Sequence, residues 1–183
     1  MGTIILIVVL VLIVLWAIAT YNSLVGLRMR VQEAFSGMDV YLKKRYDLIP
    51  NIVETVKGYA KHEQETLEKV INARNKAVSA TTPTEKVDSE KELSGCISRL
   101  FALTESYPDL KADTQFTNLQ GELSKIETDI AQARKYYNGS VKGYNTKVSL
   151  FPAVIIAKIF GFHAEPFFTV DDESERKNVK VQF

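Results

Sequence analysis

Residues 116–151 read FTNLQGELSKIETDIAQARKYYNGSVKGYNTKVSLF. Apolar side chains recur through this stretch every three or four residues, from Phe116 to Phe151. Such spacing places them along one side of an α-helix, as in the seam between packed helices. It predicts a single helix of about 35 to 40 residues, much longer than the usual length of about 11 or 12.

Three more helices are predicted before this one. The same apolar period predicts helices from residue 21 onward, from about residue 47 to 80, and from about residue 85 to 107. Asp47 is expected to cap the second of these, with Pro50 in its first turn, and Asp109 or Asp113 is expected to cap the fourth helix. In the alternative, Pro50 only kinks one very long helix, and three helices remain.

The connecting loops are short, so neighbouring helices are expected to be antiparallel. The predicted fold is all-α, with an N-terminal transmembrane helix followed by an antiparallel four-helix bundle of long helices. The predicted organisation is an anchor at residues 1–20, a bundle at residues 21–151, and a short apolar segment with a charged tail at residues 152–183.

The N-terminus carries an uninterrupted apolar segment. Sixteen consecutive apolar residues run from Ile4 to Ala19, and the first charged side chain is Arg28. With its flanks the segment reaches about 20 residues, or about 30 Å as a helix, which matches the core of a bilayer. Trp16 and Tyr21 would then lie near one interface. The segment therefore predicts a retained single-span anchor.

A cleaved signal peptide is the alternative for this segment. Residues 17–19 (AIA) resemble a cleavage site, but the first three residues lack the basic charge that such peptides usually carry. For a retained anchor, Arg28 and Arg30 follow the span, so the positive-inside rule predicts a bundle in the cytoplasm below the cell membrane. Only these two arginines lie close enough for the rule to apply, so the extracytoplasmic side stays open.

The apolar run at residues 153–162 contains one charge, Lys158, and is too short to span a bilayer. Four antiparallel helices would return this run to the membrane surface. We therefore expect Ile155, Lys158, Ile159 and Phe162 to lie in the membrane interface. The alternative is that the run folds back and closes the end of the bundle core. Residues 171–177 are expected to be a solvated charged stretch.

Composition and motifs exclude several functions. The chain has 23 basic and 22 acidic residues and a net charge of +1, so nucleic acid is not expected as a partner. The single cysteine, Cys96, cannot form an intrachain disulfide or a cysteine-based zinc site. The sequence lacks the common zinc, nucleophile-elbow and phosphate-loop motifs, and neither His62 nor His163 lies in a Glu-x-x-His pair. We predict no catalytic residue, no cofactor and no metal site.

One set of polar residues is expected to form interhelical contacts or to face a partner: Asp39, Arg45, Asp47, Glu54, His62, Arg74 and Arg134. Arg74 and Arg134 each follow an alanine near an apolar stripe, which favours ion pairs between helices. Their expected partners are Asp39, Glu54 or Glu127. The alternative for both arginines is a polar groove that receives a partner. Residues 43–45 (KKR) are expected to be a solvated basic face.

Several short motifs occur in a distinctive order: residues 21–25 (YNSLV), 39–51 (DVYLKKRYDLIPN), 56–63 (VKGYAKHE), 73–74 (AR), 133–138 (ARKYYN), 144–145 (YN), 151–152 (FP) and 161–162 (GF). This series resembles the LemA family of bacterial membrane proteins, over the chain from the anchor to about residue 168. The resemblance implies an N-terminal transmembrane helix and a helical soluble domain. It implies no catalytic residues, because the family has no established molecular function. Some relatives are linked to magnetosome membranes, which implies an organising role at a membrane.

The expected function is accordingly that of a non-enzymatic, membrane-anchored scaffold or adaptor. Such a protein would present helix faces to protein partners or to copies of itself. Two alternatives stay open: a bundle that binds a lipid or small ligand, and a metal protein with a site in the bundle core.

Overall fold

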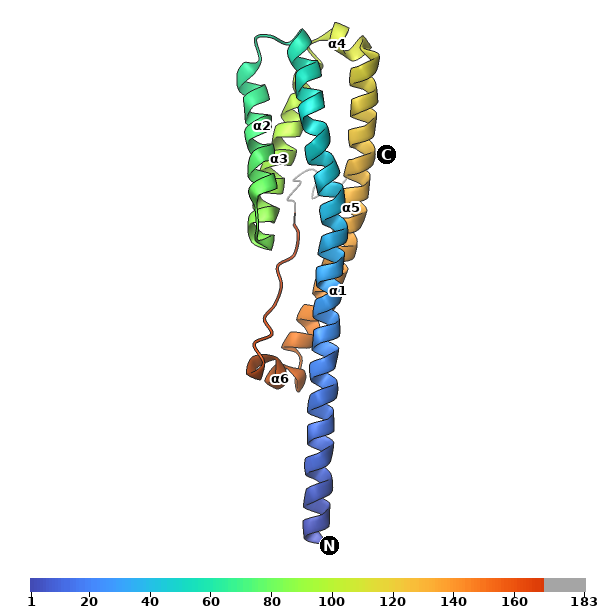
Figure 1. The fold of residues 1–183 in the computed structure, drawn as a ribbon, viewed down its shortest axis with the longest axis vertical. Helices are drawn as coiled ribbons and strands as arrows, with labels where there is room; N and C mark the ends of the chain where they lie inside the picture. Colours follow the sequence, from blue (N-terminus) through green and yellow to red (C-terminus); the bar gives the residue numbers. More distant parts are fainter. Residues whose placement is uncertain (170–183) are drawn as a thin grey trace, which may run out of the picture. The chain divides into compact units, whose positions relative to one another are not determined.

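The structure is a computed structural model that describes residues 1–169. These residues contain six α-helices (Figure 1): α1 Gly2–Tyr59, α2 Gln64–Ser79, α3 Pro83–Thr104, α4 Pro108–Ala112, α5 Thr114–Ser149 and α6 Ala153–Ile159. The predicted all-α class is confirmed, and α5 has 36 residues, as its apolar spacing predicts. The charged stretch at residues 171–177 lies outside the described residues.

The chain forms two compact units by its internal contacts. The first unit comprises residues 1–40 and 130–167, and the second comprises residues 41–129 with the chain from residue 168 onward. Helices α1 and α5 each contribute to both units, because each continues through a unit boundary.

Four helical segments form most of the second unit: the end of α1, then α2, α3 and the start of α5. Helices α2 and α3 lie side by side and run in opposite directions (Figure 1). The core of this unit is aliphatic, and its fully buried side chains include Leu42, Ile49, Ile52, Val56, Val70, Leu93, Leu100 and Leu123. The bundle prediction is therefore confirmed in part, since the packing of α2 on α3 agrees with it but the helix boundaries differ.

Pro50 does not begin a new helix. Helix α1 continues through it to Tyr59, and a non-helical connection follows only at residues 60–63. The expected helix boundary at Asp47 is therefore wrong. A proline inside a helix removes the N–H that would bond the carbonyl four residues earlier, here that of Tyr46. In this structure the Nε of Arg74, on α2, donates to the Tyr46 carbonyl oxygen at 3.1 Å. The helix survives because a side chain replaces the missing donor.

Local caps set the starts of α3 and α5. The Thr82 hydroxyl accepts the Glu85 N–H at 3.2 Å, while the Glu85 carboxylate accepts the Thr82 N–H at 3.0 Å. This is a reciprocal capping box, and Pro83 occupies the first turn. Asp113 caps α5 by accepting the Phe116 N–H at 2.7 Å. That bond, with a second from the Tyr59 hydroxyl, holds the pKa of Asp113 below its ordinary value.

In the first unit, α1 carries the predicted apolar stripe, with Leu24, Val31 and Met38 buried. The seam of α5 supplies buried Tyr137, Val141 and Tyr144 in the same unit. Rings from the two helices meet where Phe35 and Tyr137 pack edge to face with centroids 5.8 Å apart.

Helix α6 ends at a glycine turn. Gly161 adopts a positive φ of 70°, and the N–H of Phe162 donates to the carbonyl of Ala157 at 2.8 Å. This is the glycine-terminated bond pattern that closes many helices, because only glycine takes that backbone conformation without strain.

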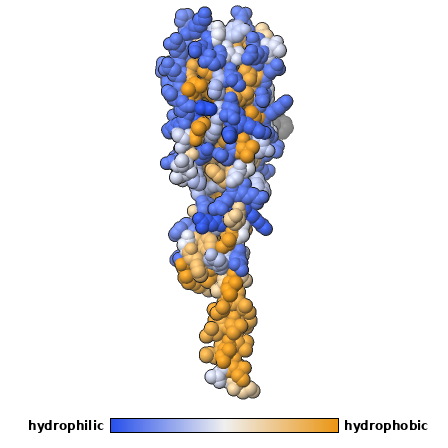
Figure 2. Space-filling model, in the orientation of Figure 1, coloured by the Kyte–Doolittle hydropathy of each residue, from blue (hydrophilic) through white to orange (hydrophobic). Residues whose placement is uncertain are grey.

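One described helix, α1, is long and apolar enough to cross a membrane. Its large apolar side chains from Ile4 to Ile18 are each between 38% and 66% exposed, and Trp16 is the least exposed of them. Figure 2 shows this part of the chain as a continuous apolar surface. Nothing within the described residues covers that surface.

The replacement of the missing donor at Pro50 can be tested by a double-mutant cycle. Arg74→Met leaves the Tyr46 carbonyl without its donor, so unfolding should become easier by about 1–3 kcal/mol. In a Pro50→Ala background the alanine N–H can bond that carbonyl, and the same change should cost much less. Thermal unfolding of the full chain in detergent micelles, followed by circular dichroism, measures both effects. An equal cost of Arg74→Met in the two backgrounds would contradict this account.

Candidate functional site

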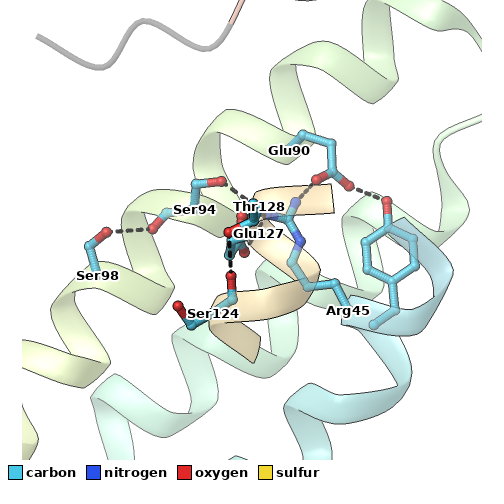
Figure 3. Close-up of polar contacts among 8 residues, drawn as sticks. Arg45, Glu90, Ser94, Ser98, Ser124, Glu127 and Thr128 are labelled. Carbon is cyan, nitrogen blue, oxygen red and sulfur yellow. Dashed lines mark hydrogen bonds and ion pairs between the residues drawn. The ribbon is translucent and has the colours of Figure 1, made fainter. Parts of the chain in front are cut away.

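A buried network of polar side chains joins three helices of the second unit (Figure 3). At its centre lies Arg45 of α1, whose Nη2 forms an ion pair with Oε2 of Glu90 on α3. Its Nη1 donates to Glu127 Oε1 of α5 at 2.9 Å and to Ser94 Oγ of α3 at 3.3 Å. The Tyr46 hydroxyl donates to the other oxygen of Glu90. The guanidinium thus contacts two carboxylates from different helices.

The two charged groups at the centre of this network, Arg45 and Glu90, are buried, so each needs a partner of opposite charge. Arg45 is 2% exposed and Glu90 is fully buried, whereas the Glu127 side chain is 41% exposed. A buried charge without partners would cost several kcal/mol. Arg45 is therefore not part of a solvated basic face, and that expectation holds only for its exposed neighbours Lys43 and Lys44. In the structure Arg45 instead connects α1 to α3 and α5.

The other predicted polar residues are placed separately. Arg74 contacts the Tyr46 carbonyl and the Asn75 side chain, so its partner is backbone and not one of the expected carboxylates. Glu54 is exposed and accepts a weak bond from Lys57 on the same helix, at 3.4 Å. Asp47 and His62 are exposed, whereas Asp39 and Arg134 are half-buried. The structure therefore does not gather the seven residues into one site.

Glu90 is the important residue that sequence reasoning missed. It continues the apolar spacing of α3, four residues before Ser94 and three before Leu93, at a position where an apolar side chain is expected. Arg45 lies in the α1 stripe in the same way, between Leu42 and Ile49. Each apolar stripe thus carries one charged residue, Arg45 in α1 and Glu90 in α3. This was the feature of the sequence from which a buried ion pair could have been predicted.

A second polar cluster lies in the first unit and holds the segment after α6. The Tyr137 hydroxyl donates to the Pro166 carbonyl at 2.9 Å. The Asn145 amide is bonded twice to the backbone of Glu165, donating to its carbonyl and accepting from its N–H, both at 2.9 Å. Burial, assisted by the Glu165 charge, raises the pKa of Tyr137 to about 12. At neutral pH its hydroxyl is therefore a stable donor.

The predicted interface residues divide between two environments. Ile155, Lys158 and Ile159 are exposed on α6, while Phe162 is buried. The rings of Phe160 and Phe162 pack edge to face on Tyr21, with centroids 4.8 and 5.7 Å away. The structure thus places the apolar run beside the residue that follows the N-terminal apolar segment.

Each unit also has an open groove on its surface. In the second unit a groove of about 550 Å³ lies between α1 and α2, lined by Val53, Glu54, Lys57, Gln64, Leu67, Glu68, Ile71 and Asn72. In the first unit a groove of about 650 Å³ lies between α1 and α5, lined by Leu27, Arg30, Gln132, Lys135, Tyr136, Gly139, Ser140 and Gly143. Both are lined by apolar and charged residues together, which is a composition suited to a helix or peptide.

The chemistry available in these places is that of structural polar contacts. Within residues 1–169, no group of three or more His, Cys, Asp or Glu side chains is close enough to hold a metal ion. The network around Arg45 pairs a cation with carboxylates from two other helices, an arrangement that holds the three helices together.

Comparison with known proteins identifies relatives. A family model described as the LemA family matches residues 34–183. The chain is 28% identical over 168 residues to a protein named LemA from Metamycoplasma hominis, a match that covers 86% of this chain and 75% of that protein. It is 25% identical over 174 residues to the magnetosome protein MamQ 2 of Paramagnetospirillum magneticum, and 23% identical to the magnetosome protein MamQ of Magnetospirillum gryphiswaldense. Each of these matches covers 81% of this chain and 64% of the relative, so the chain spans less than two thirds of the magnetosome proteins.

The buried pair predicts an asymmetric response to mutation. Glu90→Leu leaves the guanidinium of Arg45 with only a partly exposed carboxylate, and should reduce the free energy of unfolding by about 3–5 kcal/mol. Adding Arg45→Met removes the stranded charge and should restore most of that loss. The matched control is Glu92→Leu on the same helix, which breaks an exposed pair with Lys76 (2.5 Å) and should cost less than about 1 kcal/mol. Unfolding in detergent micelles reports all three, and a double variant less stable than Glu90→Leu alone would reject the pairing.

Proposed function

The chain belongs to the LemA family, and we propose that it is a non-enzymatic scaffold or adaptor, anchored in the cell membrane by a single span at residues 1–20. The observation that carries the proposal is a run of sixteen consecutive apolar residues whose large side chains are all exposed, in a helix that continues without interruption into the packed units. In water such a surface would be strongly unfavourable. In a bilayer the same helix satisfies its own backbone groups and its side chains meet lipid.

The absence of a linker supports a presenting role. Helix α1 is 58 residues long and connects the apolar segment directly to the buried stripe that begins at Leu24. A flexible linker would let a soluble domain sample many orientations, whereas a continuous helix restricts them. Helix faces and the groove of the first unit would therefore be presented to partners, or to copies of this chain, in restricted orientations.

The use of buried polar groups favours a scaffold over an enzyme. Arg45 and Glu90 neutralise each other, and Tyr137 and Asn145 bond the backbone of the segment after α6. A catalytic site needs polar groups that are aimed at a substrate and held by others. In the described part of the chain these groups hold helices and backbone. A lipid- or small-ligand-binding bundle, or a metal protein, is the alternative that the tests below would reveal.

Proximity labelling in the native cell tests the scaffold directly. A labelling enzyme fused after residue 183 should mark a limited set of membrane-associated proteins, or this chain itself if it self-associates. Metal analysis and lipid mass spectrometry of the purified full chain provide the contrary outcomes. Stoichiometric metal or one co-purifying small ligand, with no consistent protein neighbour, would replace the scaffold with one of the alternatives.

The anchor predicts retention in membranes. The full chain should stay in the membrane pellet after carbonate washing, with residues 4–19 still present by mass spectrometry. Leu10→Arg together with Val11→Arg places two charges at the centre of the span, at a cost of about 2.5–3.5 kcal/mol each, and should move the protein to the soluble fraction. The same two positions changed to alanine are the matched control and should remain in the pellet. A soluble mature chain that begins at Thr20 would show a cleaved signal peptide instead.

The charge pattern predicts the side of the membrane. In a Cys96→Ser background, Thr81→Cys places one thiol in the exposed loop before α3. A membrane-impermeant thiol reagent should fail to label it in intact cells and should label it after the cells are opened. Labelling in intact cells would place the bundle on the extracytoplasmic side and overturn the argument from Arg28 and Arg30.

A further inference from the structure

Helix α6 is held at one level of α1. Phe160 and Phe162, on either side of the Gly161 turn, both pack on Tyr21, which lies two residues beyond the apolar segment that ends at Ala19. The bonds of Tyr137 to Pro166 and of Asn145 to Glu165 fix the chain that leaves α6. The position of α6 along the first unit is therefore set by contacts on both of its sides.

The two faces of α6 differ in burial although both are apolar. Ala153, Ile156 and Ala157 are buried in the first unit. The opposite face exposes Ile155 and Ile159, and the residues at the two ends of the helix, Leu150, Phe151 and Phe160, are also exposed. Ile159 is 69% exposed and Phe160 is 58% exposed. The sequence leaves two interpretations of this run: membrane interface or bundle core. The buried face agrees with the core interpretation, and the exposed face is open to the interface interpretation.

We propose that the exposed face of α6 lies in the membrane interface beside the anchor, as a second membrane contact of the same chain. This proposal rests on the proposed function, because the span sets the depth of Tyr21. If residues 1–20 cross the bilayer, Tyr21 enters the headgroup region, and side chains that pack on Tyr21 lie at the same depth. The exposed face of α6 therefore meets the headgroup and acyl-chain boundary.

The composition of α6 fits a lipid surface. Its only charged residue is Lys158, which is exposed and has a stem long enough to lie along apolar surface while its ammonium reaches phosphate groups. Figure 2 shows apolar side chains on the surface around α6, next to the apolar part of α1. The exposed apolar surface is thus continuous with the surface of the anchor, which lipid already covers. This continuity favours lipid over a second copy of the chain as the occupant.

Fluorescence quenching can separate this contact from the anchor. The chain has one tryptophan, Trp16, so Trp16→Phe provides a background without tryptophan. Phe160→Trp in that background places a reporter at the end of α6, where the native side chain is 58% exposed. The full-length chain is reconstituted in phosphatidylcholine–phosphatidylglycerol vesicles whose acyl chains are brominated near the carbonyl end. The introduced indole should emit at short wavelength and lose most of its fluorescence to bromine.

Three control variants test the interpretation. Tyr136→Trp in the same background lies on α5, is 60% exposed as Tyr136, and is about 20 Å of helix before the end of α5, so it should remain unquenched. Ile155→Asp with Ile159→Asp places two charges against the lipid and should reduce quenching of the Phe160→Trp reporter, while the melting temperature stays unchanged because both side chains are exposed. Ile156→Asp on the buried face should instead lower the melting temperature.

Three outcomes would overturn the membrane contact. Unquenched, water-like emission from the Phe160→Trp reporter would show that α6 faces solvent. Short-wavelength emission without quenching would show that protein, such as a second copy, covers the face. A lowered melting temperature in the Ile155→Asp, Ile159→Asp variant would show that this face is core. Quenching of native Trp16 in parallel tests the anchor alone, so the anchor can stand when the α6 contact fails.

Discussion

A guanidinium buried inside a helical bundle constrains everything around it. Arg45 is 2% exposed, and its charge cannot be removed by deprotonation at any ordinary pH. It must be neutralised where it lies, and the carboxylates that do so come from α3 and α5. Three helices that are distant in sequence are thereby required to meet at one level of the second unit. Any packing that separates Glu90 from Arg45 breaks the ion pair of the buried carboxylate and leaves Arg45 with only the partly exposed Glu127 as a carboxylate partner.

The backbone beside Arg45 adds a second requirement. Pro50 leaves the Tyr46 carbonyl without its helical donor, and Arg74 of α2 supplies one. Arg45 and Tyr46 are consecutive, so the side chain of one and the backbone of the other together bring α2, α3 and α5 to the same turn of α1. The continuity of α1 and the packing of its neighbours therefore involve the same two consecutive residues, Arg45 and Tyr46.

Sequence reasoning recovered the features that depend on local chemistry. The seam of α5 and the cap at Asp113 each follow from the spacing or capping preference of a few adjacent residues. The same holds for the apolar segment of α1. These elements needed no knowledge of tertiary contacts.

The features that it missed depend on partners distant in sequence. Local rules place Pro50 either in the first turn of a new helix or at a kink within a long one, and the bond that Arg74 donates to the Tyr46 carbonyl is seen only in the structure. In the same way, three consecutive basic residues suggest a solvated face until Glu90 and Glu127 are seen beside one of them. The register of Arg45 and Glu90 within apolar stripes was visible, but the pairing was not, because the sequence does not state which stripes face each other.

Amphipathic helices of this kind can pack in more than one register, because a shift by one turn replaces one apolar contact with another. A buried ion pair adds little net stability compared with well-packed apolar side chains, since desolvation offsets most of its attraction. The pair instead destabilises the alternative registers. A shift of one turn would bury Arg45 and Glu90 away from each other, at a cost of several kcal/mol. In the first unit, the bonds of Tyr137 and Asn145 to the chain after α6 act in the same sense, because a slipped segment would lose three bonds at once. The buried polar groups of this chain thus select one arrangement of surfaces, which a scaffold requires, since a partner can recognise helix faces only if their register is fixed.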